Sequence, residues 1–181
     1  MTPQSPGAVV LVRPGRFLPN PLTARDNAFQ RRADRGPDQI AEDAYREVTE
    51  AAWMLSSAGV TVHLFDDAEA TRPDAVFPNN WFSTHPDGRI ALYPMYAPNR
   101  RTERRSDIID LLKHRYRVQH VLDYSGVEHD EVFLEGTGAM VLDHAARLAF
   151  TARSRRADPA LLERFCADFG YTPVLFDAVG P

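Results

Sequence analysis

The chain has 181 residues, a length that suits one domain with a substantial apolar core. Hydrophobic residues make up 44% and charged residues 25%, as in ordinary globular proteins. No apolar run approaches the roughly 18 residues of a membrane-spanning helix. The net charge of -4 argues against a nucleic-acid-binding protein, which needs a basic surface to neutralise phosphates. We therefore expect neither nucleic acid nor a membrane among the partners.

The N-terminus and the cysteine content bear on location and on cofactors. Residues 1–7 lack the basic and apolar regions of a secretory signal. Cys166 is the only cysteine, which excludes an internal disulfide and argues against a cysteine-based zinc site. The six histidines show neither HxxxH nor HxH spacing. We expect a cytoplasmic protein without a metal or another cofactor.

The first part of the chain reads as strand, loop, helix and strand. The apolar run Ala8–Arg13 predicts a buried strand that Pro14 ends. A long polar loop over Phe17–Arg35 follows. The apolar stripe within Asp38–Ala58 predicts a helix that ends at Gly59, and Val60–Phe65 predicts a second strand.

The second part shows the order hairpin, helix, strand twice. Turn residues between apolar runs predict each hairpin, and a 3.6-residue apolar spacing predicts each helix. The first set consists of Trp81–His85, Arg89–Tyr93, a helix over Thr102–Tyr116 and a strand over Arg117–Leu122. The second consists of Ala139–Leu142, Arg147–Thr151, a helix that Asp158 caps and Gly170 ends, and a strand over Tyr171–Phe176.

The two sets align as copies of one ββαβ unit. Placing Arg89 on Arg147 gives an offset of 58 positions (147 − 89), and placing Arg117 on Tyr171 gives 54 (171 − 117). With the strand, helix and strand before them, the chain holds roughly three copies. Such a repeat predicts a radial or solenoidal array, in which each unit buries its apolar face on its neighbours. Common α/β patterning could also produce two similar copies by chance.

Two adjacent amides, Asn79 and Asn80, follow Pro78 directly before a predicted strand. Binding groups are often built at such strand ends, and an amide both donates and accepts, so it can bind a neutral urea or amide group. The plain alternative is that the two asparagines only form a turn.

A second polar motif is Glu135, which precedes the turn Gly136-Thr137-Gly138 and an apolar strand. Glycines let the backbone approach a ligand closely, and the carboxylate could hold a ligand nitrogen or an imidazole. The motif lacks the lysine of a phosphate-binding loop. Its plain alternative is a glycine-rich turn with a solvated glutamate.

Three further features have a structural and a functional interpretation. The loop over Asn20–Gln30, with Asn27 and Phe29, either caps a substrate or is ordinary surface. Cys166 belongs to the apolar stripe of the last helix, so we interpret it as a structural residue. We interpret the arginine cluster within residues 100–105 as a solvated helix start, with an anion site as the alternative.

Several segments together resemble the amidinotransferase/deiminase (pentein) superfamily, and within it the citrulline-utilisation hydrolases. They are VRPGRF from Val12, the loop from Asn20 to Gln30, FPNNWFSTH from Phe77 and LEGTGAMVLD from Leu134. The resemblance covers essentially the whole chain, and the combination of FPNNWFSTH with LEGTGAMVLD is specific.

The resemblance implies an α/β propeller of five ββαβ modules, about three of which the single partial domain 1–181 would contain. It implies a C–N hydrolase or amidinotransferase in which a cysteine thiolate attacks the amidino or ureido carbon and a histidine is the general acid and base. Glu135 matches the glutamate that pairs with that histidine and a substrate nitrogen, and is the catalytic residue expected here. Asn79, Asn80, Asn27 and Phe29 are the expected substrate-binding residues.

Two departures from the family pattern bear on the substrate. Asn80 stands where deiminases place an aspartate. Gly138 stands where many deiminases have a second aspartate. A ureido group is neutral, so a second buried carboxylate would have no positive charge on the substrate to compensate its own. The departures favour a citrulline-like substrate over arginine.

The resemblance further places the catalytic histidine and the nucleophilic cysteine beyond Pro181. The chain would then be a substrate-binding N-terminal part, inactive alone, that forms a homo-oligomer or needs a C-terminal portion. The alternatives are a non-catalytic binding or assembly module of the same origin and an unrelated α/β domain.

Overall fold

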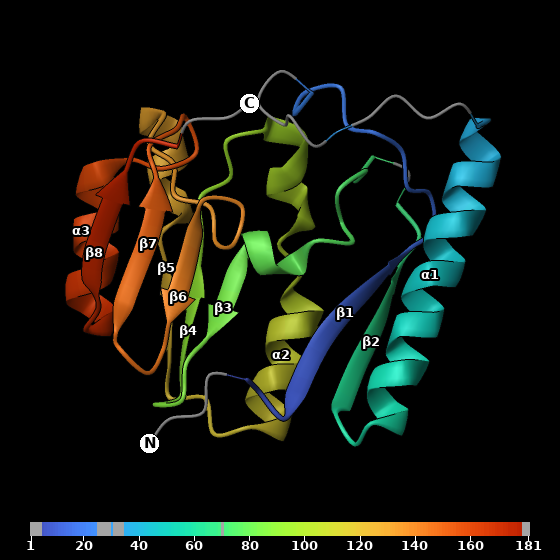
Figure 1. Cartoon of the computed structure of the whole chain (residues 1–181), viewed down its shortest axis with the longest axis horizontal. Coiled ribbons are helices and arrows are strands. Elements are labelled where there is room, and N and C mark those ends of the chain that lie inside the picture. Colours follow the sequence, from blue (N-terminus) through green and yellow to red (C-terminus); the bar gives the residue numbers. More distant parts are fainter. Residues whose placement is uncertain (1–4, 25–29, 31–34, 70, 179–181) are drawn as a thin grey trace. The chain divides into compact units, whose positions relative to one another are not determined.

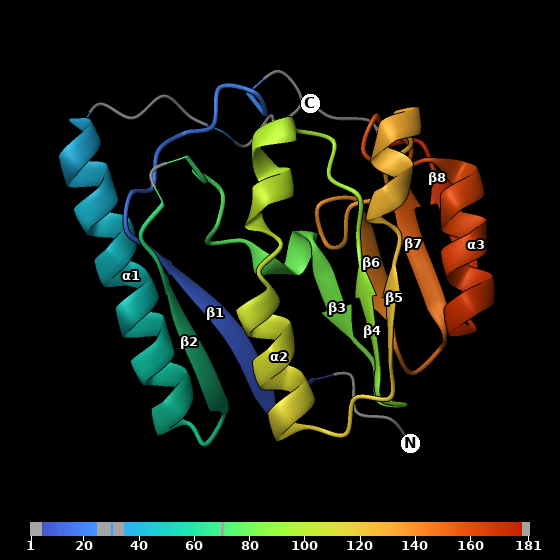
Figure 2. The same cartoon turned by 180° about the vertical axis from the view of Figure 1, so that it is seen from behind.

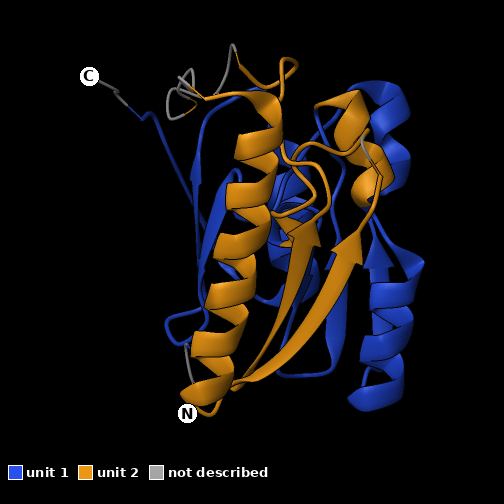
Figure 3. Ribbon diagram, turned by 90° about the vertical axis from the view of Figure 1, so that its right-hand side faces the viewer, with its two compact units in different colours: residues 1–5, 79–96, 104–181 blue, residues 6–78, 97–103 orange. Residues whose placement is uncertain are grey.

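The computed structural model describes residues 5–24, 30, 35–69 and 71–178. They form an α/β fold that falls into two compact units, coloured separately in Figure 3. One, which we call the β1–β2 unit, comprises residues 6–78 and 97–103 and is orange in Figure 3 (unit 2). The other, the β3–β8 unit, comprises residues 1–5, 79–96 and 104–181 and is blue (unit 1). None of the helices in the described ranges is long and apolar enough to cross a membrane.

The β1–β2 unit is built on two parallel strands joined by one long helix (Figure 1). Strand β1 (Ala8–Pro14) pairs in register with β2 (Thr61–Asp67), and α1 (Pro37–Ser57) contacts both strands. A proline in the first helical turn suits α1, because its missing N–H would have had no partner there. Gly59, just beyond the helix end, takes a φ of 86°, which favours glycine. These elements confirm the predicted strand, helix and strand.

The β3–β8 unit contains two successive ββαβ motifs (Figures 1 and 2). In each, an antiparallel hairpin is followed by a helix and by a strand parallel to the second hairpin strand. The first consists of β3 (Phe82–Thr84), β4 (Arg89–Leu92), α2 (Ser106–Arg115) and β5 (His120–Asp123). The second consists of β6 (Met140–Asp143), β7 (Leu148–Ala152), α3 (Pro159–Phe169) and β8 (Thr172–Phe176).

The strand register supports one predicted offset and corrects the other. Ala91 in β4 and Ala149 in β7, which are 58 positions apart, are both fully buried. Leu122 pairs with Ala91, and Pro173 pairs with Ala149. The third strands therefore correspond at an offset of 51 (173 − 122), and the predicted 54 was wrong. The segment between helix and strand is longer in the first copy, where Tyr116 to Gln119 precede β5.

Helix boundaries follow the local capping chemistry. At α3, Asp158 Oδ1 accepts a hydrogen bond of 2.8 Å from Leu161 N, and Gly170 ends the helix with a φ of 70°. Both features confirm the prediction. The helix predicted over Thr102–Tyr116 was too long, because a separate 3-10 helix spans Pro98–Glu103 and Arg105 is extended. The α-helix therefore starts only at Ser106.

The core of the β3–β8 unit lies around α3. The buried face of this helix packs with residues of the strands and loops around it. The helix contributes Leu161, Leu162, Phe165, Cys166 and Phe169, and the surroundings contribute Ala91, Tyr93, Tyr124, Met140, Ala149 and Tyr171. The opposite face of the β6–β7–β8 sheet is different. Val141, Phe150 and Phe176 are 60%, 38% and 44% exposed, and Val141 lies directly opposite Phe150. Because side chains alternate between the faces of a sheet, these residues form one exposed apolar surface, which we call the outer face.

Candidate functional site

The glycine-rich turn folds onto the two adjacent asparagines by main-chain hydrogen bonds. Gly136 N donates to Asn80 O at 2.8 Å, and Thr137 N donates to Asn79 O at 3.0 Å. A Cβ atom at position 136 would lie 2.3 Å from Asn79 O, so the contact requires glycine. The turn and the Asn79–Asn80 segment, far apart in sequence, thus form one structural element.

Glu135 is fully buried at the start of this turn. Its Oε1 accepts a hydrogen bond of 3.2 Å from Tyr96 N, and its Oε2 lies 3.5 Å from Arg156 Nη1. Its own N–H donates to Arg156 O at 3.0 Å. A buried carboxylate needs a counter-charge and hydrogen bonds, and these residues supply both. The alternative of a solvated glutamate was wrong.

The side chains of Asn80 and Glu135 converge beside Gly138. The point that a Cβ atom would occupy at position 138 lies 2.8 Å from Glu135 Oε2 and 3.3 Å from Asn80 Nδ2. Gly138 itself is exposed. A methyl group at this point would be too close to the carboxylate oxygen, so the two side chains can converge here because residue 138 is a glycine. An aspartate side chain at position 138 would meet the same crowding.

The remaining predicted binding residues are less informative. Asn79 is exposed and contacts the turn through its carbonyl oxygen. Asn27 and Phe29 lie outside the described residues. Nearby in sequence, Asn20 is buried in the β1–β2 unit, where its Nδ2 donates to Asp74 Oδ2 at 2.7 Å.

Two contacts that support Glu135 were missed from the sequence, namely those with Tyr96 and Arg156. A second ion pair holds the chain just before Tyr96. Arg104 binds Glu128 through two hydrogen bonds of 2.5 and 2.9 Å, and Glu128 Oε1 also accepts from Met95 N at 2.7 Å. The long-range partners of these arginines leave no signal in local sequence.

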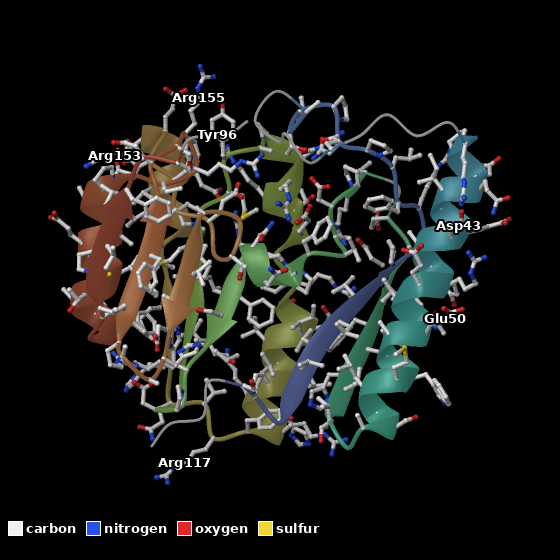
Figure 4. All side chains as sticks on the ribbon, viewed as in Figure 1. Asp43, Glu50, Tyr96, Arg117, Arg153 and Arg155 are labelled. Atoms are coloured by element: carbon white, nitrogen blue, oxygen red, sulfur yellow. The ribbon has the colours of Figure 1, made fainter. Side chains whose placement is uncertain are left out.

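Tyr96, Arg153 and Arg155 lie at one end of the β3–β8 unit, and Arg117 lies at the other end (Figure 4).

The arginine cluster before α2 is not a solvated helix start. Arg100 is 2% exposed and binds Glu103 through hydrogen bonds of 2.9 and 3.1 Å. Asp74 lies 3.6 Å from its Nε. Arg105 pairs with Asp107 at 2.7 Å. The prediction was wrong because acidic partners lay both next to the cluster and far away in sequence.

Cys166 lies in the core and is 2% exposed. Burial raises the pKa of its thiol to about 11, so the thiol stays protonated near neutral pH. This supports the structural interpretation. Among the residues that the structure describes, no cluster of three or more His, Cys, Asp or Glu side chains could hold a metal ion.

Two ββαβ motifs with a buried glutamate beside a glycine turn fit an α/β protein of the amidinotransferase/deiminase type, which the resemblance predicted. The family model described as "N,N dimethylarginine dimethylhydrolase, eukaryotic" matches residues 13–181. The chain belongs to this family. No curated protein sequence gives a significant match.

Solved structures share the fold at low identity. A dimethylarginine dimethylaminohydrolase variant, crystallised as an adduct with S-methyl-L-thiocitrulline, is 13% identical, with a TM-score of 0.66 over 95% of this chain and 62% of that one. A Pseudomonas aeruginosa dimethylarginine dimethylaminohydrolase in complex with citrulline is also 13% identical, with a TM-score of 0.59 over 95% and 62%.

The N-terminal domain of ArgZ, an arginine dihydrolase from the ornithine-ammonia cycle in cyanobacteria, is a further match. It is 13% identical, with a TM-score of 0.67 over 96% of this chain and 58% of that chain. This chain thus spans less than two thirds of the length of each of these structures.

Proposed function

We propose that the chain is the substrate-binding part of a C–N hydrolase that acts on a guanidino or ureido amino acid. The observation that carries the proposal is the convergence of a Glu135 oxygen and the Asn80 amide at Gly138, where they lie 2.8 and 3.3 Å from the point that a Cβ atom would occupy. In this site Glu135 accepts hydrogen bonds from substrate N–H groups, and the Asn80 amide donates to the substrate. The solved structures with S-methyl-L-thiocitrulline and citrulline support this substrate class.

Within this class, a neutral ureido substrate of the citrulline type fits the site best. Arg156 already supplies the counter-charge of Glu135, so a cationic guanidinium would add an excess positive charge at a buried position. Asn80 contributes no second carboxylate that could compensate it. We favour hydrolysis over amidino transfer, because the family that the chain belongs to is described as a hydrolase family.

The covalent step needs a nucleophile that the core cysteine does not provide. Cys166 is buried among apolar side chains, and its raised pKa keeps it protonated. Cys166 is therefore not the nucleophile in this proposal, and we assign the nucleophilic cysteine and the catalytic histidine to polypeptide outside these residues, as the family resemblance implies. The 181 residues would form one partial domain, with about three modules of a five-module propeller. A cytoplasmic location remains our prediction.

Isothermal titration calorimetry tests the proposal. The purified chain is titrated separately with L-citrulline, L-arginine and dimethyl-L-arginine. We expect citrulline to bind more tightly than arginine, and Glu135→Gln to weaken binding at least tenfold. Asp130→Asn, a change at an exposed acidic residue, is the control and should leave the affinity unchanged. Equal or absent binding of all three compounds would contradict the proposal, and so would ammonia release by the chain alone that Cys166→Ser abolishes.

The exposed outer face favours a second function, that of a non-catalytic assembly module. Val141, Phe150 and Phe176 present apolar surface that a further module or another copy would cover. In that case light scattering should show self-association, and none of the three ligands should bind. A strictly monomeric chain that binds citrulline would exclude this second function.

A further inference from the structure

Five side chains in the β3–β8 unit form a continuous hydrogen-bonded chain. Tyr93 Oη lies 2.6 Å from Ser83 Oγ, which lies 2.9 Å from His85 Nε2. On the other side of the ring, His85 Nδ1 lies 3.3 Å from Tyr171 Oη, which lies 2.7 Å from His144 Nδ1. We call these five residues the relay. None of them takes part in the site described above.

The two ends of the relay lie in different surroundings. Tyr93 is fully buried, and a Cβ atom at Gly136 would lie 3.1 Å from its ring, so Tyr93 packs directly against the turn that follows Glu135. His144, in the turn between β6 and β7, is partly exposed. The relay therefore connects a solvent-accessible imidazole with the packing beneath the glycine turn.

Every member of the relay can both donate and accept, so its hydrogen bonds can run in either of two directions. One direction is favoured when both imidazoles are neutral, because a phenol donates more strongly than a serine hydroxyl or an imidazole N–H. Tyr93 then donates to Ser83, Ser83 to His85 Nε2, His85 Nδ1–H to Tyr171, and Tyr171 to His144.

Protonation of His144 is incompatible with that direction. Both nitrogens of an imidazolium are donors, so Tyr171 must accept from His144 and donate to His85 Nδ1. His85 Nδ1 then carries no proton. Its single proton sits on Nε2 and is donated to Ser83, which in turn donates to Tyr93. The net change is the uptake of one proton from solvent by His144. His85 loses the proton on Nδ1 and gains one on Nε2, so every other member of the relay carries as many protons as before.

We infer that Ser83, His85 and Tyr171 relay the protonation state of His144 to Tyr93, and that the buried His85 changes from the Nδ1–H to the Nε2–H tautomer when His144 is protonated. The inference goes beyond the proposed function, because it requires neither substrate nor turnover.

The charged groups around the relay allow this exchange without a charge on His85. Asp87, Arg89, Arg147 and His144 face His85, and the rings of Phe165 and Phe169 from α3 pack against it, with the Phe169 centroid 4.2 Å away. Arg147 and Asp143 face His144. Arg147 also lies over the Tyr171 ring at 4.0 Å. Burial lowers the pKa of His85 to about 3, so between pH 5 and 8 its ring is neutral and only its tautomer can change.

Long-range 1H–15N spectra of the ¹⁵N-histidine-labelled full chain, recorded between about pH 8 and pH 5, test the inference, because they distinguish protonated from unprotonated ring nitrogens. We expect His85 Nδ1 to be protonated at pH 8, and its proton to move to Nε2 with the same midpoint as the titration of His144. A His85 tautomer that stays constant while His144 titrates, or that changes with a different midpoint, would overturn the inference.

Three variants separate the relay from a general effect of pH. Tyr171→Phe should leave the titration of His144 in place and abolish the tautomer change at His85. Should Tyr171→Phe not fold, His144→Gln tests the same link at the exposed end and should fix one tautomer over the whole range. His114→Gln, at an exposed position of α2, is the control and should keep the coupled transition. A tautomer change that persists in either relay variant would refute the link.

Discussion

The guanidinium of Arg156 lies 3.5 Å from Oε2 of Glu135, a carboxylate that is fully buried. The side chain of Arg156 is itself only 13% exposed. In such surroundings each ionised group mainly offsets the desolvation cost that the other would have as a buried, unpaired charge. The pair can therefore be tested by removing one partner, or both.

We expect Arg156→Met to reduce the free energy of unfolding by about 3 kcal/mol, because it removes the guanidinium that lies 3.5 Å from a buried carboxylate. The double variant Arg156→Met/Glu135→Gln should recover much of that loss. Urea unfolding followed by circular dichroism measures both. Arg164→Met, which removes an exposed ion pair with Asp168, should change stability by less than about 0.5 kcal/mol. Equal losses in the single and the double variant would show that the pair is not coupled.

Gly136→Ala should destabilise the chain by about 2 kcal/mol or more, because the new methyl group would lie 2.3 Å from a main-chain oxygen that cannot move alone. Gly126→Ala is the matched control, since a Cβ atom there would meet nothing within 4 Å. Thermal unfolding of both variants gives the comparison. A melting temperature of Gly136→Ala equal to that of the control would contradict the tight contact between the turn and Asn79.

Gly138→Ala should disturb the arrangement of Glu135 and Asn80. The methyl group would lie 2.8 Å from Glu135 Oε2 and 3.3 Å from Asn80 Nδ2, so the buried carboxylate or the amide would have to move. We expect a loss of stability of about 1–2 kcal/mol, together with loss of citrulline binding in calorimetry. Unchanged affinity in a folded variant would place the ligand elsewhere.

The stability of the β3–β8 unit should depend on pH through His85. Its pKa is lowered to about 3 by burial and, second, by the charge of His144. An unfolded histidine titrates near pH 6.5, so between these values the unfolded chain binds the extra proton and stability falls as the pH falls. The maximal slope is about 1.4 kcal/mol per pH unit, and above about pH 7 the contribution of His85 is constant.

The comparison with His85→Gln isolates this effect from other titrating groups. The stability difference between the parent chain and the variant, obtained from urea unfolding at several pH values, should shrink steadily between about pH 6 and pH 4. The exposed variant His114→Gln should instead run parallel to the parent chain. A pH-independent difference for His85→Gln would mean that His85 takes up a proton in the folded state.

Cys166 should resist thiol reagents until the chain unfolds. Because burial raises its pKa to about 11, neither access nor thiolate is available in the native state at pH 8. We expect 5,5′-dithiobis(2-nitrobenzoate) to react with one equivalent of thiol in guanidinium chloride and negligibly without it. Fast labelling of the native chain would show that α3 opens.

The sequence predicted those parts of the fold that local rules determine. Asp158, Pro159 and Gly170 mark both ends of α3, and the Pro86-Asp87-Gly88 turn marks the first hairpin. The start of α2 was missed because Arg100 and Arg104 pair with Asp74 and Glu128, which are far away in the sequence. Local pattern carries no information on such partners.

The candidate site shows the same division. Asn80 and Glu135 were recognisable because each belongs to a local motif, the Pro78-Asn79-Asn80 segment before a strand and the glycine-rich turn that begins at Gly136. Arg156 and Tyr96 were not, because one acts through a long side chain and the other through a main-chain N–H. Any residue type can provide a main-chain donor, so its position follows only from the fold.

The exposed outer face of the β6–β7–β8 sheet also bears on the fate of the chain in a cell. Val141, Phe150 and Phe176 are exposed on it, and exposed apolar surface of this kind is what holdase chaperones bind. The abundance of free chain is then set by the balance between capture, proteolysis and covering of this face, and not by the free energy of unfolding alone.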